Sequence, residues 1–496
     1  MGFFYGENMA ELVPSFNDFK ALSEKGNLIP IYQEVDAALE TPLSAYLKIG
    51  TGNYSFLLES VEGGERMARY SFIGTNPYKV LKTGPLEKSG AKDPLPDVES
   101  ELGKFHVVPV KGLPRFLGGA VGYLSYDCAH HFEPKIPSFR ESVFNIPESV
   151  FMFADTLLVF DHLLHKIKVV SHAHVKGDSD EQIRKAYEKA SNAIKCLVQK
   201  LTNPLPSIPS DDIKAVNKDK GSSNKTSDQY IEMVQKAREY IIAGDVIQVV
   251  PSQRIAKKTS ATAFELYRAL RGVNPSPYMY MLELEDFAIV GASPEMLVRV
   301  EDEIVETHPI AGTRRRGLTD QEDQVLESEL RGDEKEIAEH VMLLDLGRND
   351  IGRIAEPGSV TVTQMLDIER YSHVMHLVSH VTGKLDAGKS AYDALRACFP
   401  AGTVSGAPKI RAMEIIAELE GEARGPYAGA VGYFSFDGNM DTAIAIRTMV
   451  LKDNTVYVQA GGGVVYDSDP DLERQESLQK MAATLRAIEI AEGRSI

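Results

Sequence analysis

Tryptophan is absent from the 496-residue sequence, and cysteine is scarce. The three cysteines, Cys128, Cys196 and Cys398, lie far apart without a CxxC pair, which excludes a disulfide framework or a thiolate zinc site and favours a reducing compartment. The most apolar stretch, residues 150–164, contains two aspartates and is too short to cross a bilayer. The first residues lack the basic segment and apolar run of a signal peptide. We therefore expect a cytoplasmic protein without a membrane segment.

Positive charge is also in short supply. The chain has 54 lysines and arginines against 71 aspartates and glutamates, a formal net charge of −17. This acidity argues against nucleic acid or an anionic membrane as a partner. With 43% hydrophobic and 25% charged residues, the composition is that of a globular protein.

The clearest change in composition falls at residues 203–226, where three prolines precede a polar stretch. We interpret this segment as a linker or surface loop between an N-terminal domain, residues 12–202, and a C-terminal domain, residues 227–496. The first domain is rich in short β-forming segments, with a Gly/Pro/Lys-rich loop at 84–103. Periodicity in the second domain predicts helices at 227–244, 333–346 and 470–492 and strands at 246–250, 278–284, 287–291, 296–300 and 303–307. The pattern predicts an α+β fold with clustered antiparallel strands.

Two ten-residue segments, 118–127 and 428–437, share a pattern of glycines and aromatic residues. Either the two segments are structurally equivalent strands, or glycine was selected twice where a neighbouring backbone approaches closely. The sequence leaves both explanations open.

Two of the predicted helices carry pairs of acidic residues at helical spacing. For either helix alone, a solvated acidic face is the ordinary explanation. If the two pairs faced each other, they would form an all-oxygen site suited to Mg²⁺, although spacing does not show that they do. The residues are Glu336 and Glu339, next to His340, on one helix, and Glu473 and Glu476, next to Lys480, on the other.

Three glycine-rich segments lie at 309–313, 401–409 and 461–463. None matches a Walker A loop or a GxGxxG fingerprint, so neither ATP nor a dinucleotide is predicted. Their backbone amides can instead bind carboxylates, and Arg447 could add fixed positive charge to such a site.

Together, these motifs closely resemble those of the chorismate-utilising enzymes, and the resemblance covers nearly the whole chain. It implies two packed antiparallel β-sheets flanked by helices, with the active-site cleft between the sheets. It would make the first domain the carrier of a feedback segment and the second the chorismate-binding catalytic domain. The motifs are PIAGTR at 309–314, EIAEH through LGRND at 336–350, FPAGTVSGAPK at 399–409, and GGG through Glu476 at 461–476.

Two positions discriminate among the reactions of this family. Relatives that add water to chorismate carry a lysine base at the position of Gln248, and an amide cannot accept that proton. Relatives that make aminodeoxychorismate carry a nucleophilic lysine at the position of Ala311, and a methyl group cannot form that intermediate. The resemblance therefore implies amination of chorismate followed by release of pyruvate to give anthranilate, the first step of tryptophan biosynthesis. Aminodeoxychorismate formation and a non-catalytic, tryptophan-sensing subunit are the alternatives.

The resemblance also implies a role for each site residue. Glu339 and Glu476 would ligate Mg²⁺, and Glu336 and Glu473 would hold its waters. Glu295 matches the general acid for the leaving hydroxyl, and His340 is a candidate for proton transfer during elimination. Arg315 stands where relatives often have proline, which leaves the shape of its loop open. The remaining catalytic positions are Gln248 and Thr313, and the substrate-binding residues are Gly312, Thr313, Tyr427, Arg447, Gly461, Gly462, Gly463 and Lys480.

Two partners of the site are expected. No cysteine stands between glycines as a glutaminase nucleophile would, so ammonia from glutamine would require a separate glutamine amidotransferase subunit in a hetero-oligomer. L-Tryptophan would inhibit at a distinct site whose segments resemble the feedback site of the family, although buried strands explain the same residues. These residues are Glu59, Ser60, Pro277, Tyr278, Met279, Val431, Gly432 and Tyr433.

Overall fold

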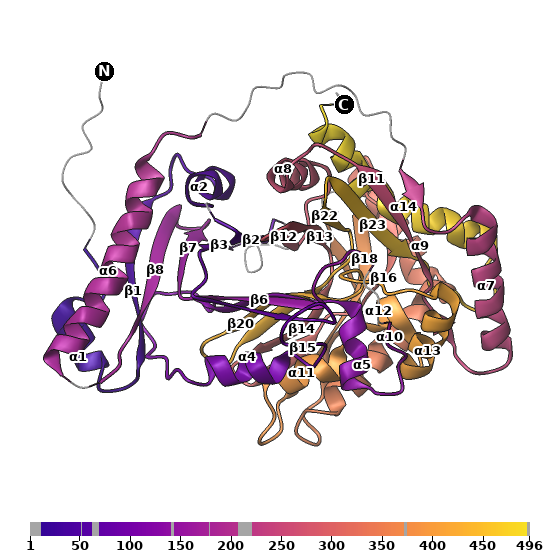
Figure 1. The fold of residues 1–496 in the computed structure, drawn as a ribbon. Coiled ribbons are helices and arrows are strands. Elements are labelled where there is room, and N and C mark those ends of the chain that lie inside the picture. Colours follow the sequence, from indigo (N-terminus) through magenta and orange to yellow (C-terminus); the bar gives the residue numbers. More distant parts are fainter. Residues whose placement is uncertain are drawn as a thin grey trace.

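The computed structural model describes residues 11–50, 52–61, 69–139, 143–177, 179–206, 221–371 and 374–493. Two large antiparallel sheets pack against each other, and helices cover their outer faces (Figure 1). This arrangement confirms the predicted α+β fold. In the described ranges, no helix is both long and apolar enough to cross a membrane.

The first sheet has eleven strands, and residues from both halves of the sequence build it. Strand β2 pairs with β12 across the boundary between the halves. The order is β1 (Leu28–Asp36), β8 (Lys166–His174), β7 (Thr156–Asp161), β3 (Tyr70–Thr75), β2 (Tyr54–Glu59), β12 (Tyr278–Leu284), β13 (Phe287–Ser293), β22 (Thr448–Lys452), β23 (Thr455–Gly461), β11 (Ser252–Lys258) and β9 (Ser222–Ser223).

The second sheet has a ten-strand arrangement and is shared in the same way. Strand β17 (Thr361–Arg370) pairs with β18 beside the main path of the sheet. That path runs β16 (Ile310–Arg315), β18 (Val374–Lys384), β15 (Ile304–Thr307), β14 (Met296–Glu301), β21 (Met440–Ile444), β20 (Ala430–Ser435), β5 (Gly119–Leu124), β6 (Ser149–Ala154) and β4 (Lys79–Thr83). A further two-stranded sheet joins β10 (Gln248–Val249) to β19 (Gly406–Ala407).

Helices surround both sheets. On the first sheet, α6 (Asp180–Thr202) packs against β1 and β8, and α8 (Ala263–Val273) and α14 (Pro470–Ala491) pack against β13 and β23. On the second sheet, α10 (Glu334–Gly352) packs against β16 and β18, and α11 (Ala391–Cys398) against β14. The others are α1 (Phe16–Leu22), α2 (Pro42–Ile49), α4 (Leu95–Leu102), η1 (Tyr126–Cys128), α5 (Ala129–Phe132), α7 (Ser227–Ile242), α9 (Asp320–Gly332), α12 (Gly402–Ser405) and α13 (Lys409–Glu420).

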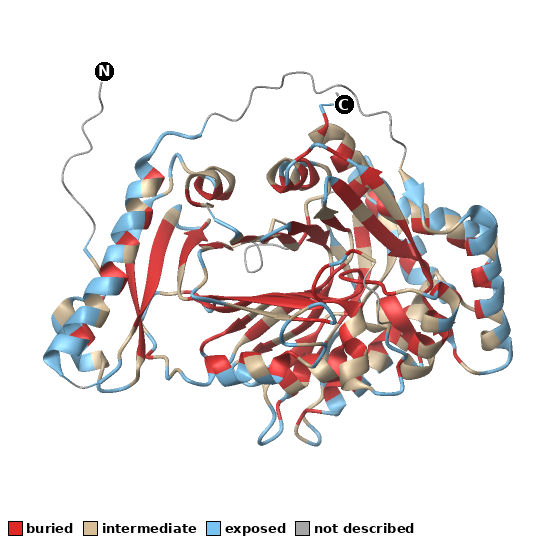
Figure 2. Cartoon of the chain, viewed as in Figure 1, coloured by how far each residue is buried: buried red, intermediate tan, exposed pale blue. Residues whose placement is uncertain are grey.

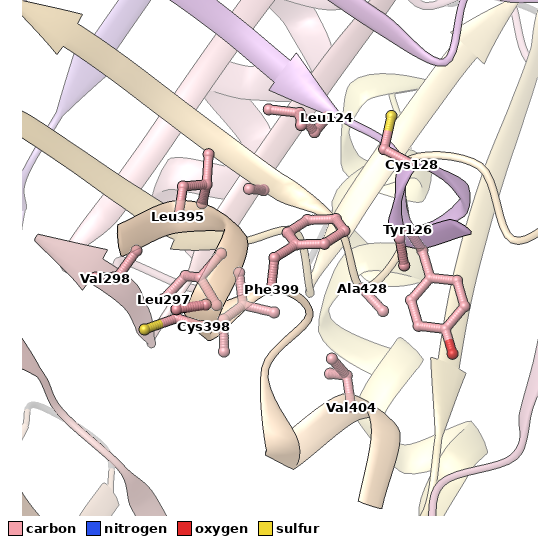
Figure 3. Close-up of a cluster of buried hydrophobic side chains, with 14 of the residues drawn as sticks. Leu124, Tyr126, Cys128, Leu297, Val298, Leu395, Cys398, Phe399, Val404 and Ala428 are labelled. Carbon is pink, nitrogen blue, oxygen red and sulfur yellow. The ribbon is translucent and has the colours of Figure 1, made fainter. Parts of the chain in front are cut away.

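The core consists of side chains from the strands and from the inward faces of these helices (Figure 2). In the largest cluster, Leu297 and Val298 of β14 pack near Leu395 and Cys398 of α11 and Phe399 (Figure 3). Burial of this apolar surface anchors α11, and the chain that leaves it, residues 399–409, against the second sheet. That chain is the FPAGTVSGAPK motif, so the core fixes one wall of the candidate site.

Most of the predicted elements are present with close bounds, including α7, α10, α14 and strands β12 to β15. The two similar segments form β5 and β20, which pair with each other and place Gly122 opposite Gly432. The predicted loop at 84–103 is partly wrong, because its last residues form α4. Of the expected linker, residues 207–220 lie outside the described ranges, and β9 pairs with β11 just beyond them.

Candidate active site

Helices α10 and α14 bring the two acidic pairs to one site. Asp333 caps α10 by accepting hydrogen bonds from its first turn, and Asp469 caps α14 in the same way. Glu339 accepts a hydrogen bond of 2.8 Å from the side-chain amide of Gln248. The negative charges of Glu336, on the same helix α10, and of Glu476, on α14, both act on the carboxylate of Glu339. The pairs therefore lie near each other, which sequence spacing alone could not establish.

The glycine loop at 461–463 lies between the two helices. A Cβ atom on Gly463 would come within 2.7 Å of Gln248 Nε2 and 3.4 Å of Glu339 Oε1. A Cβ atom on Gly462 would come within 2.6 Å of the Glu473 carboxylate. Lys480 donates to the Gly461 carbonyl at 3.2 Å. The loop thus needs glycine because its backbone passes directly against the acidic residues.

The acidic cluster carries excess negative charge in a partly buried place. Burial, with the charges of Glu336 and Glu476, raises the pKa of Glu339 above its ordinary value. Burial and the charge of Glu476 raise the pKa of Glu473 likewise, although Ser468 donates to Glu473 at 2.7 Å. Lys480 pairs with Glu476 at 2.8 Å, and Arg314 pairs with Glu336 at 3.0 Å.

No three His, Cys, Asp or Glu side chains of the described ranges converge as closely as a preformed metal site requires. The donor set is nevertheless made of carboxylate oxygens, the ligands that Mg²⁺ prefers. Carboxylates that raise one another's pKa repel each other, and a cation that binds among them reduces this repulsion. The residues present therefore fit a hard divalent cation that keeps part of its water shell.

Arg447 is a cation that has no carboxylate partner among the described residues. It has a left-handed backbone with a φ of 52° between β21 and β22, and its carbonyl accepts a hydrogen bond from the Ala292 amide. Within the described residues, no carboxylate lies within 4.0 Å of its guanidinium, and burial lowers its pKa. Its ionisable neighbour is Tyr427, whose pKa burial raises to about 12. A half-buried guanidinium beside a phenol, with no carboxylate partner among the described residues, is suited to an anionic ligand.

A bulge in β16 shapes the adjoining wall. Gly312 has a φ of 59°, and the register with β18 shifts between Ala311 and Thr313. A Cβ atom on Gly312 would meet Glu336 Oε2 at 3.2 Å, so the bulge lies against the acidic cluster. Arg315 ends β16 opposite Val374, so its segment is strand and not an open loop.

Sequence reasoning missed one histidine of this wall, His376 on β18. Its Nδ1 lies 3.0 Å from the hydroxyl of Thr313 and 3.3 Å from the carbonyl of Gly312. Burial lowers its pKa, and the nearby charge of Arg447 lowers it further. It is therefore a neutral imidazole beside two predicted substrate-binding residues. Its position opposite Thr313 in a strand pair was the signal that could have identified it.

The predicted catalytic His340 lies deeper in the protein. It is completely buried, its Nε2 lies 2.6 Å from the hydroxyl of Ser379, and its Nδ1 has no hydrogen-bond partner among the residues that the structure describes. Burial lowers its pKa to about 4. Its catalytic role stays a prediction, and His376 is the better-placed histidine.

Glu295 lies between β13 and β14 and is 7% exposed. Burial raises its pKa to about 8, against weaker opposing effects of Thr403 and Lys480. It lines a depression with about 390 Å³ of empty space, together with Thr403, Gly402 and Leu343. A carboxyl group that holds its proton at pH 7 can act as a general acid, as predicted for this residue.

The predicted tryptophan residues come from both sheets, with Val431, Gly432 and Tyr433 on β20 of the second sheet, and those of the first sheet point to its two faces. Tyr278 reaches toward the second sheet, where Tyr433 stacks on Phe116 at 4.1 Å. Glu59 points the other way, accepting from the Tyr267 hydroxyl at 2.5 Å and pairing with Arg271 at 3.2 Å. Glu59 therefore already has two partners in this structure, and its role in binding tryptophan stays a prediction. Ser60 follows the last residue of β2, Glu59, which pairs with Met279 of β12.

The described site can be set beside known proteins. The profile of the chorismate binding enzyme family matches residues 53–486. Anthranilate synthase component 1 of Acetivibrio thermocellus is 48% identical over 492 residues, covering 96% of this chain and 99% of that protein. Its counterpart in Saccharomyces cerevisiae is 45% identical, with 97% of each chain covered.

Solved structures agree. The crystal structure of anthranilate synthase component I from Streptococcus pneumoniae superposes with a TM-score of 0.75 at 39% identity, covering 91% of this chain and 98% of that one. The menaquinone-specific isochorismate synthase of Escherichia coli superposes with a TM-score of 0.68 at 18% identity, covering 95% and 98%, which shows a shared fold.

The chain therefore belongs to the chorismate-binding enzymes. Within that family, the relatives of highest identity named above are component 1 of anthranilate synthase, and the chain spans nearly their whole length.

Proposed function

We propose that the protein is the large subunit of an anthranilate synthase and converts chorismate and ammonia into anthranilate and pyruvate. The observation that carries the choice among family reactions is the side chain at position 248. It is an amide whose nitrogen donates to Glu339, so it cannot act as the base that a water-adding relative needs. Ala311, beside the bulge, offers only a methyl group and excludes a lysine-bound intermediate.

The charge layout fits a dicarboxylate substrate. Arg447 and Tyr427 would hold the enolpyruvyl carboxylate, because this guanidinium lacks a described acidic partner. Lys480 and the amides of residues 461–463 would hold the ring carboxylate near the acidic cluster. Mg²⁺ held by Glu339 and Glu476, with Glu336 and Glu473 on its waters, would supply charge neutralisation and orientation of that carboxylate.

The reaction follows in two stages. Ammonia forms a bond to C2 of the ring while the C4 hydroxyl leaves, and Glu295 supplies the proton that converts this hydroxyl to water. The C2 proton is then removed and the C3–O bond breaks, which makes the ring aromatic and releases enolpyruvate; protonation of its methylene carbon gives pyruvate. His376, held by Thr313, is placed beside Arg447 to accept a proton in this second stage.

A direct assay separates the alternatives. Purified chain is mixed with chorismate, Mg²⁺ and an ammonium salt, and anthranilate fluorescence and pyruvate are measured together. Equal amounts of both products are expected. Isochorismate would contain no nitrogen, aminodeoxychorismate would form without pyruvate, and a non-catalytic subunit would form neither.

The ammonia is proposed to come from glutamine through a separate amidotransferase subunit. Cys128 and Cys398 are buried, and burial raises the pKa of both thiols, which leaves them unreactive. Cys196 is exposed on helix α6, which packs against β1 and β8, strands far from the acidic helices in the sheet order. Glutamine-dependent turnover by this chain alone would contradict the proposal.

Inhibition by L-tryptophan is proposed at the space between Tyr278 and Tyr433. Aromatic side chains from both sheets meet there, which suits an indole ring. Because the chain contains no tryptophan, bound ligand is detectable by its own fluorescence without background. Ser60→Phe should relieve inhibition and leave uninhibited turnover nearly unchanged. A fully inhibited Ser60→Phe variant would argue against this site.

A further inference from the structure

A row of charged side chains crosses the second sheet on the face that meets the first. Asp441 on β21 lies opposite Arg299 on β14, and Arg299 lies opposite Glu306 on β15. Arg299 Nε donates to Glu306 Oε1, and His380 Nε2 lies 2.7 Å from Glu306 Oε2. The row therefore runs without interruption over four adjacent strands.

One end of the row meets the proposed tryptophan site. Tyr278, which comes from the first sheet, donates its hydroxyl to Asp441 Oδ1 at 3.1 Å. Tyr433 lies opposite Asp441 in the pairing of β20 with β21. A ligand between these two tyrosines would thus contact the hydrogen bond that ends the row.

The other end of the row lies on the strand that carries His376. His380 is four residues further along β18, so both histidines project from the same face of the strand. Strand β18 also pairs with β16 and holds Thr313 opposite His376. A shift of β18 would therefore alter the wall of the active site.

Arg299 has two carboxylate neighbours, one on each side, and bonds to one of them. Although burial opposes it, hydrogen bonds from His380 and Arg299 bring the pKa of Glu306 down to about 2. Burial raises the pKa of Asp441 to about 6, even though Arg299 acts to lower it. In this structure the guanidinium thus favours Glu306, and the described donor to Asp441 is the Tyr278 hydroxyl.

We propose that Arg299, Asp441 and Glu306 couple the tryptophan site to strand β18, an inference that rests on the proposed inhibition. A ligand that displaces the Tyr278 hydroxyl leaves Asp441 without its donor. Arg299 then turns to Asp441 and releases Glu306, which leaves His380 of β18 as the described side-chain partner of Glu306 and changes how β18 is held. The two positions of one guanidinium provide the two states that coupling between distant sites requires.

Two charge-removing substitutions test this coupling because they act in opposite directions. Asp441→Asn keeps an acceptor for Tyr278 but holds Arg299 on Glu306, so the tryptophan concentration for half-inhibition should rise at least about fivefold, the low end of typical coupling. Glu306→Gln favours Arg299 on Asp441, so that concentration should fall by a similar factor and turnover should decrease. A merely structural role would shift both variants in the same direction.

The control is Glu301→Gln, which removes the same charge from β14, the strand of Arg299, but outside the row, where Glu301 pairs with Arg115. It should leave both half-inhibition and turnover unchanged. Thermal unfolding and the KM for chorismate show whether each variant keeps the native fold. If only one of the two row variants folds, its half-inhibition still tests the coupling. Unchanged half-inhibition in a folded Asp441→Asn, or a rise in Glu306→Gln, would overturn the coupling while the proposed inhibition stands. Absence of tryptophan binding to the unmodified chain would overturn both.

Discussion

Glu295→Gln should abolish most activity and at the same time stabilise the folded protein. The carboxyl is 7% exposed, and burial raises its pKa from 4.5 to about 8. A shift of 3.5 units corresponds to about 5 kcal/mol of differential stability at about 1.4 kcal/mol per unit. The glutamine variant cannot donate the proton to the leaving hydroxyl, so its rate should fall about 10²- to 10⁴-fold.

The sign of the stability effect follows from the raised pKa. The folded state keeps the proton up to about pH 8, whereas the unfolded chain loses it near pH 4.5. Stability from this group is therefore fully present below pH 4.5 and is lost as the pH rises toward 8. At pH 7 the loss amounts to about 3 kcal/mol, and the uncharged glutamine avoids it.

Urea unfolding of both proteins at pH 5, 6, 7 and 8, followed by tyrosine fluorescence, measures this difference. The advantage of Glu295→Gln should grow by about 1.4 kcal/mol per pH unit between pH 5 and 7 and level off near pH 8, where the folded state also loses the proton. In parallel, kcat/KM of the unmodified enzyme should decline as the pH rises through about 8. A stability difference that does not vary with pH, or a variant with nearly full activity, would refute the reasoning.

Three further outcomes are expected. Glu339→Gln should retain the fold but lose most turnover and require more Mg²⁺, because the substitution removes the charge of a proposed metal ligand. Turnover by the unmodified chain that EDTA does not reduce would argue against the metal. Arg447→Gln should raise the KM for chorismate at least about tenfold, since one charge-assisted contact contributes about 1.5–3 kcal/mol, and an unchanged KM would remove Arg447 from the site. His376→Asn should release pyruvate more slowly than it consumes chorismate, accumulating the aminated intermediate, whereas equal slowing of both would assign His376 to the first stage.

Local sequence signals predicted the acidic helices well. Asp333 and Asp469 are N-caps, and the apolar spacing that follows each gives α10 and α14 nearly the expected bounds. The charges of Glu339 and Glu476 interact because of how α10 and α14 pack, and no local sequence pattern encodes that packing. The family resemblance supplied that expectation, and the structure brings the residues together.

The misses have physical causes. Helix α4 begins in a segment whose prolines and glycines indicated a loop, yet Leu95, Val98 and Leu102 bury one helical face. His376 was missed because its approach to Thr313 depends on the pairing of β18 with β16, which no local motif encodes. Glu59 stays a predicted tryptophan-site residue, and its carboxylate contacts Arg271, a residue more than 200 positions away.

The interleaving of the two sheets governs how the chain must fold. Strands β2 and β5 find their partners β12 and β20 only after more than 200 and 300 further residues have been synthesised. Until then, each presents an open, largely apolar edge, the kind of surface that promotes aggregation. Pairings of such long sequence separation also slow the search for the native topology. Truncation before β20 should therefore yield insoluble chain, because β5 would lack its strand partner.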